Sequence, residues 1–182
     1  MESIFKGQPD LAKQLGREDA AFKTIDRIFR VQSARIYKEQ NCYRALIVNE
    51  KDFIKTLSEM NRGLESIQKE LRSFLEGKRG IFPRFYFLSN EDLLEIIGQG
   101  KDPTPINKHI KKIFEGINKI KTDGGSGKGA DKVYIIKSIS SHDDETIDFD
   151  TDIGVKTNTN VESWLMVLIK SMKAALQKLF NK

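Results

Sequence analysis

The sequence predicts a mainly α-helical fold: an elongated bundle of amphipathic helices with one β-hairpin near the C-terminus, α+β by content. Apolar residues recur at helical spacing over residues 53–74 and 106–120. Apolar and acidic residues alternate over residues 147–153, which is the period of a half-buried strand. A last amphipathic stretch follows residue 160. The 182 residues are enough to bury a core without disulfides or a structural metal.

The first predicted helix runs from about Glu18 to Tyr43. Its apolar side consists of Phe22, Ile25, Ile28, Phe29 and Ile36. Gln32 and Ser33 interrupt this stripe, so the pattern is less regular than the one that follows.

The second predicted helix has a stricter pattern. Its seven apolar positions are Phe53, Leu57, Met60, Leu64, Ile67, Leu71 and Phe74. Their spacing alternates between four and three residues, as in the seam of a coiled coil of three heptads. Asn49 is expected to cap the start and Gly77 to end the helix. The seam either packs within the chain, which its short length favours, or forms an intermolecular coiled coil.

Residues 81–88 are rich in phenylalanine and contain Pro83. Because proline is excluded from a helix interior, we expect an extended and largely buried segment here. Ser89 is followed by an acidic residue three positions later, a helix-capping pattern, and a short buried helix with Leu93 and Leu94 comes next.

The rest of the chain divides into three predicted parts after a helical body of residues 1–122, which includes residues 81–88. The body ends with a helix whose stripe is Ile106, Ile110, Ile113, Ile117 and Ile120, with Phe114 beside it. Residues 123–131 are glycine-rich and predict a flexible loop, natural or engineered. Residues 132–157 predict the β-hairpin, and residues 158–182 predict a C-terminal amphipathic helix that contains Trp164.

Composition and motifs argue against nucleic-acid binding, a membrane span, and catalytic, metal-binding or phosphate-binding sites. The net charge of +5 is too small to indicate nucleic-acid binding, and no apolar run is long enough to indicate a membrane span. One cysteine, Cys42, and two histidines, His109 and His142, form no recognisable catalytic or metal-binding set. The glycine-rich loop lacks the Ser or Thr of a phosphate-binding loop. The aspartates at 148, 150 and 152 lack the glycine and glutamate of a calcium loop.

A resemblance to a known family is carried by residues 82–97, followed by 99–103, 109–117 and 160–165. These stretches resemble the linker of dynein heavy chains, N-terminal region 2, and nearly the whole chain takes part. Residues 114–118 and 158–162 resemble most the intraflagellar-transport type. The signature residues, structural or docking, are Phe82, Pro83, Arg84, Phe85, Tyr86, Phe87, Leu93, Leu94, Phe114 and Trp164.

The resemblance implies a non-catalytic mechanical segment, the C-terminal part of the linker, leading into the first AAA+ module of its parent chain. It would dock on the AAA+ ring and relay ATP-driven change into minus-end-directed microtubule movement. ATP and magnesium would bind the parent ring, with no cofactor in this segment. Intermediate chains, light intermediate chains and microtubules would be partners through the parent, in the cytoplasm, cytoskeleton, cilium or flagellum. The alternative is a helical scaffold or coiled-coil module unrelated to motors.

Overall fold

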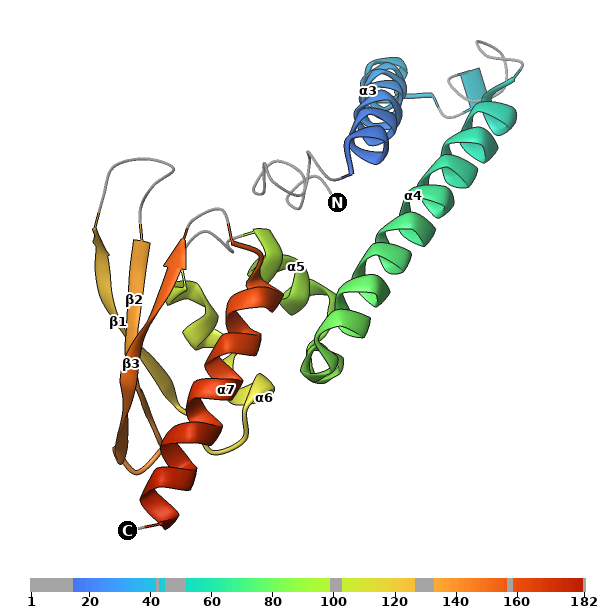
Figure 1. Cartoon of the computed structure of the whole chain (residues 1–182). Helices are drawn as coiled ribbons and strands as arrows, with labels where there is room; N and C mark the ends of the chain where they lie inside the picture. The colour runs from blue at the N-terminus through green and yellow to red at the C-terminus, as the bar shows by residue number, and fades with distance from the viewer. Residues whose placement is uncertain are drawn as a thin grey trace. The chain divides into compact units, whose positions relative to one another are not determined.

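The computed structural model describes residues 15–41, 43–44, 52–98, 103–126, 133–156 and 159–181 (Figure 1). Two compact units are separated between Phe74 and Leu75, within one long helix, and each unit is described by itself. The predicted cap Asn49 and the single cysteine, Cys42, lie outside the described residues.

The first unit contains α3 (Gly16–Glu39) and most of α4 (Phe53–Ile81). Helix α3 ends four residues before the predicted Tyr43, at a left-handed Gln40 whose N–H donates to Ile36 O. A side chain at Gly63 of α4 would lie 2.7 Å from Ile25 Cδ1 of α3. Gly63 of α4 and Ile25 of α3 therefore meet within the chain.

Helix α4 continues past the predicted end at Gly77 by four residues. Glycine in a helix interior costs only about 1 kcal/mol relative to alanine, and the surroundings of the last turn outweigh that cost. Leu75 is fully buried, and Lys78 forms an ion pair with Glu162 of the C-terminal helix. Packing therefore extends the helix beyond a residue that often ends one.

The sequence predicts an extended phenylalanine-rich segment, and this prediction is wrong. The segment forms the 3-10 helix η2 (Pro83–Phe87). Proline stands at the first position of η2, where its fixed φ suits a helical turn and its missing N–H is not needed. We call residues 82–88 the aromatic turn. Helix α5 (Asn90–Gly98) follows, and Ser89 Oγ accepts the N–H of Asp92 at 3.1 Å, as the capping pattern predicts.

The isoleucine stripe does not lie on one helix, which corrects the prediction for residues 106–120. It is divided among η3 (Thr104–Lys108), α6 (Ile110–Ile113) and strand β1 (Lys119–Ser126), and Ile117 lies in the connection between α6 and β1. Helix α6 ends at Ile113 because Phe114 has an extended backbone, and the turn that follows contains Gly116 with φ +84, a conformation that other residues rarely adopt. The five isoleucines, Ile106, Ile110, Ile113, Ile117 and Ile120, are all buried nevertheless. Periodicity identified the buried positions but not the backbone that carries them.

The predicted hairpin is present as β2 (Val133–Ser140) and β3 (Thr146–Lys156), and β1 makes it an antiparallel sheet in the order β1-β2-β3. Residues 123–126 thus belong to a strand and not to the predicted loop, whereas 127–131 lie outside the described residues. Phe149 and Ile153 of β3 are buried and the intervening aspartates are exposed, which confirms the predicted alternation.

Helix α7 (Val161–Phe180) is the predicted C-terminal helix. It runs alongside the sheet next to β3 and buries Trp164, Leu165 and Leu168 (Figure 1). Among the described helices, none has the length and apolar character needed to cross a bilayer.

Candidate functional site

The aromatic turn is held in place by Arg79, which lies in the last turn of α4. Its guanidinium donates to Leu88 O at 3.1 Å and to Asn90 Oδ1 at 2.9 Å, with a longer bond to Phe85 O at 3.4 Å. The same group forms an ion pair with Glu76 at 3.0 Å. Because charge-assisted hydrogen bonds are stronger than neutral ones, this one side chain joins α4, the aromatic turn and the start of α5.

A second arginine joins the aromatic turn to α6. Arg84 Nη1 donates to Ile113 O at 3.1 Å, and its guanidinium carbon lies 4.9 Å from the centre of the Phe114 ring. A guanidinium at this distance over a phenylalanine face is attracted by the π-system. Arg84 and Phe114, 30 positions apart in sequence, therefore form one contact.

Within the aromatic turn, the side chains divide into buried and exposed groups. Phe82 and Phe85 are buried edge to face, with ring centroids 4.8 Å apart. Tyr86 and Phe87 are 60% and 69% exposed. Tyr86 is restrained, since its hydroxyl bonds Glu76 at 3.3 Å and Arg79 lies 5.9 Å from its ring centre. We call Tyr86 and Phe87 the exposed aromatic pair.

The ten signature residues thus have different environments. Six are buried: Phe82, Phe85, Leu93, Leu94, Phe114 and Trp164. Four are exposed: Pro83, Arg84, Tyr86 and Phe87. Burial is what a structural residue requires, whereas only an exposed side chain can dock. Of the predicted set, the exposed aromatic pair is therefore the part suited to contact another surface.

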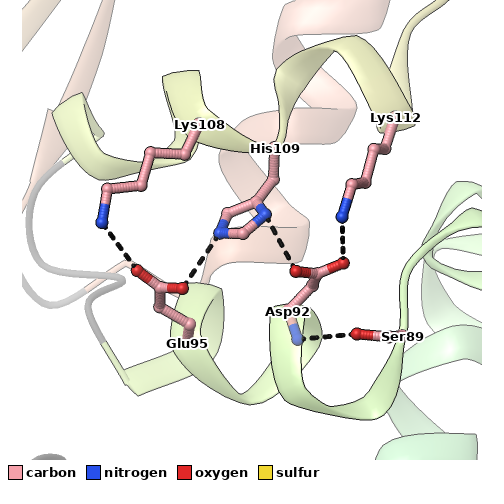
Figure 2. A network of polar contacts seen from close by, with 6 residues as sticks. All are labelled: Ser89, Asp92, Glu95, Lys108, His109 and Lys112. Atoms are coloured by element: carbon pink, nitrogen blue, oxygen red, sulfur yellow. Dashed lines mark hydrogen bonds and ion pairs between the residues drawn. The ribbon is translucent and has the colours of Figure 1, made fainter.

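A polar network joins α5 to η3 and α6 (Figure 2). His109, which is 7% exposed, lies between two carboxylates of α5: Nδ1 is 3.3 Å from Asp92 and Nε2 is 3.2 Å from Glu95. Lys112 pairs with Asp92 at 2.6 Å and Lys108 pairs with Glu95 at 3.0 Å. From the sequence, His109 belongs to no recognisable set of functional residues. The fold places it beside two acids, which come from 14 and 17 positions earlier in the chain.

The lysines of this network determine how its carboxyl groups titrate. The hydrogen bond from Lys112 lowers the pKa of Asp92 below its ordinary value, although partial burial opposes the shift. In the same way, the hydrogen bond from Lys108 lowers the pKa of Glu95 against an opposing effect of burial. Both carboxylates therefore stabilise the folded state when they are ionised.

Acidification is expected to weaken the fold through these two groups. Because both folded-state pKa values are lowered, the unfolded chain binds protons first as the pH falls. The contribution is complete above the ordinary carboxyl range and is lost as the pH falls through the lowered folded-state pKa values of the two groups. The urea midpoint of Asp92→Asn/Glu95→Gln should therefore depend less on pH in this range than that of the wild type.

The exposed turn residues Asp143 and Glu145 provide the matched control for that measurement. Their amide variant, Asp143→Asn/Glu145→Gln, should keep the wild-type acid dependence. If Asp92→Asn/Glu95→Gln also keeps the wild-type acid dependence, these two carboxylates do not contribute to the loss of stability at low pH.

The ion pair between Lys78 and Glu162 joins the end of α4 to the first turn of α7. Lys78 Nζ lies 2.6 Å from Glu162 Oε1, and the two side chains are only 14% and 5% exposed. Glu162 also lies at a helix N-terminus, where a negative charge is favoured. This pair is one direct link between the helical part of the unit and the helix that follows the sheet.

Sequence reasoning missed Arg79, the Lys78–Glu162 pair and the acids around His109. Only Arg79 carries a local signal, because a basic residue in the last turn of a helix often bonds carbonyl groups there. The other contacts join residues far apart in the sequence, and no spacing pattern connects them.

Comparison with known proteins shows the family of this chain. The family model described as "Dynein heavy chain, N-terminal region 2" matches residues 1–182. The chain belongs to the dynein heavy-chain family. Dynein axonemal heavy chain 2 of Mus musculus is 40% identical over the whole chain. The Dynein-1-beta heavy chain, flagellar inner arm I1 complex, of Chlamydomonas reinhardtii is also 40% identical, over 91% of the chain.

The cytoplasmic dynein heavy chain of Neurospora crassa is 34% identical over 98% of the chain. The chain spans about 4% of the length of each of these dynein relatives. The match excludes a helical scaffold unrelated to motors. The relatives include axonemal and cytoplasmic heavy chains, and the intraflagellar-transport type stays a prediction.

Proposed function

We propose that this segment of a dynein heavy chain is a non-catalytic mechanical part of the linker. It docks on the AAA+ ring of the same heavy chain and relays ATP-driven conformational change into minus-end-directed movement along microtubules. The single observation that carries the proposal is the aromatic turn, which is anchored by two arginines and still exposes Tyr86 and Phe87. Because the backbone of this turn is held in place and Tyr86 is restrained by Glu76 and Arg79, the pair loses less conformational entropy when it binds another surface.

A transmitting element has to resist deformation, and several contacts support this property here. Arg79, Arg84 and the Lys78–Glu162 pair join α4, the aromatic turn, α6 and α7 across long stretches of sequence. The network around His109 adds a link between α5 and α6. Elements joined in this way move together when one of them is displaced.

The nucleotide chemistry is assigned to the parent chain. ATP and magnesium would bind its AAA+ ring, and the parent would be a microtubule-dependent ATPase. Dynein intermediate and light intermediate chains and microtubules would be partners through the parent, in the cytoplasm, the cytoskeleton or a cilium. Two of the relatives are named as axonemal or flagellar and one as cytoplasmic, which supports these compartments.

The docking proposal is tested with Tyr86→Ala/Phe87→Ala in the complete heavy chain. We expect microtubule gliding to slow severalfold while ATP hydrolysis continues, since loss of the docking contact uncouples the ring from the linker. Gliding velocity and ATPase rate are measured on the same preparation. Tyr37→Ala removes an aromatic side chain of α3 that is also exposed and serves as the matched control. Wild-type velocity in the double variant would refute docking through the exposed aromatic pair.

A further inference from the structure

Glu76, near the end of α4, connects the exposed aromatic pair to the arginine that holds the aromatic turn. One oxygen of its carboxylate, Oε1, accepts a hydrogen bond from Arg79 at 3.0 Å. The other oxygen, Oε2, accepts one from the Tyr86 hydroxyl at 3.3 Å. A carboxylate can accept both bonds at once, because each oxygen carries its own lone pairs. Glu76 therefore bridges a guanidinium and an exposed phenol.

Arg79 gives this bridge a fixed base. Its side chain is only 11% exposed, and its guanidinium also donates to the carbonyls of Phe85 and Leu88, which flank the exposed aromatic pair. The guanidinium carbon lies 5.9 Å from the centre of the Tyr86 ring, within the range of cation–π attraction. Tyr86 is thus restrained at its hydroxyl and at its ring, although the residue is 60% exposed.

We propose that Glu76 is a positioning residue for docking, which holds the side chain of Tyr86 in the orientation that meets the AAA+ ring. This inference rests on the docking proposed above. An aromatic side chain on a surface samples several rotamers, and binding has to select one of them. Glu76 and Arg79 make that selection before the partner surface arrives, so docking orders one side chain fewer.

Glu76 and Arg79 have separate roles in this set of contacts. Arg79 stabilises the backbone of the aromatic turn, in which the Leu88 N–H donates to Phe85 O at 3.1 Å. In the part of the chain that the structure describes, the Glu76 carboxylate reaches the turn through the side chains of Arg79 and Tyr86. Removing this carboxylate should therefore free the side chain of Tyr86 and leave the backbone of the turn in place.

The four tyrosines of the chain make the restraint on Tyr86 measurable. In the 182-residue chain with isotopically labelled tyrosine, NMR relaxation gives an order parameter for each aromatic ring. Tyr134 is 8% exposed and Tyr37 is 85% exposed, so they provide a restrained and a mobile reference. We expect the order parameter of Tyr86 to lie near that of Tyr134 in the wild type. In Glu76→Ala it should fall toward that of Tyr37.

Glu70→Ala is the matched control, because it removes an exposed carboxylate from the same helix. It should leave the order parameter of Tyr86 unchanged. Hydrogen exchange of the Leu88 amide reports on the backbone of the turn and should be equal in the wild type and both variants. An unchanged Tyr86 order parameter in Glu76→Ala would overturn the positioning role. Faster exchange at Leu88 in this variant would also overturn it, because Glu76 would then stabilise the turn itself.

In the complete heavy chain, Glu76→Ala is expected to lower gliding velocity about twofold relative to Glu70→Ala, since docking must then order the side chain of Tyr86. Tyr86→Ala/Phe87→Ala, measured beside it, separates this inference from the docking proposal. Wild-type velocity in Glu76→Ala, together with slow gliding in the double variant, would overturn the positioning role alone. Wild-type velocity in both would refute docking, and the positioning role would fall with it.

Discussion

Phe85→Ala is expected to lower the free energy of unfolding by about 3–5 kcal/mol. The side chain is 0% exposed, and its ring packs edge to face against Phe82. Removing it leaves a cavity at the centre of the aromatic turn, between groups that Arg79 and Arg84 hold in place and that cannot easily collapse. Urea unfolding of the variant, followed by far-ultraviolet circular dichroism, measures the loss.

Phe87→Ala is the matched control, because it removes the same residue type from the same turn. Its side chain is 69% exposed, and we expect a change within about 0.5 kcal/mol. Similar losses in both variants would mean that burial does not distinguish the two positions. A near-neutral Phe85→Ala would mean that the aromatic turn is not a packed core.

Lys78→Met is expected to cost about 3 kcal/mol, the second large effect. It removes the cation 2.6 Å from Glu162 and leaves a carboxylate that is only 5% exposed without this ion pair. A buried charge that loses its partner is far more destabilising than the pair itself is stabilising. The position of Glu162 at the N-terminus of α7 moderates the loss without removing it.

The double variant Lys78→Met/Glu162→Met tests this reasoning. With both charges replaced by apolar side chains of similar length, stability should return to within about 1 kcal/mol of the wild type. Lys173→Met changes an exposed lysine of α7 in the same way and should be nearly neutral. If the double variant is as unstable as Lys78→Met, the loss comes from packing of the lysine stem and not from the charge of Glu162.

The isoleucine series shows how far pattern reasoning reaches. All five positions from Ile106 to Ile120 are buried, as their spacing predicts. The same spacings of three and four residues occur in a chain that folds as η3, α6 and β1. A residue is buried because of its place in the core, so its burial does not show that it lies on a helix. Gly116 marks the break, but a single glycine within a helical pattern is only a weak signal.

In the aromatic turn, tertiary contacts determine a backbone conformation that the sequence pattern did not predict. Proline correctly excluded a helix interior at residue 83, yet the segment winds into η2 because Arg79 supplies donors for the carbonyls of Phe85 and Leu88. The surroundings of His109 are likewise set by α5, which carries both of its acidic neighbours. A rule that compares only neighbouring residues in the sequence cannot predict these contacts.

From its amino acids alone, this chain could be recognised as mainly helical with a C-terminal hairpin, as a segment of the dynein heavy-chain family and as one whose signature lies at residues 82–97. Those properties depend on local periodicity and on short motifs, which linear order preserves. The division of the ten signature residues into six buried and four exposed ones, the third strand and the groove between β3 and α7 depend on folding. They arise because packing, ion pairing and strand pairing act between residues that are distant along the chain and adjacent in space.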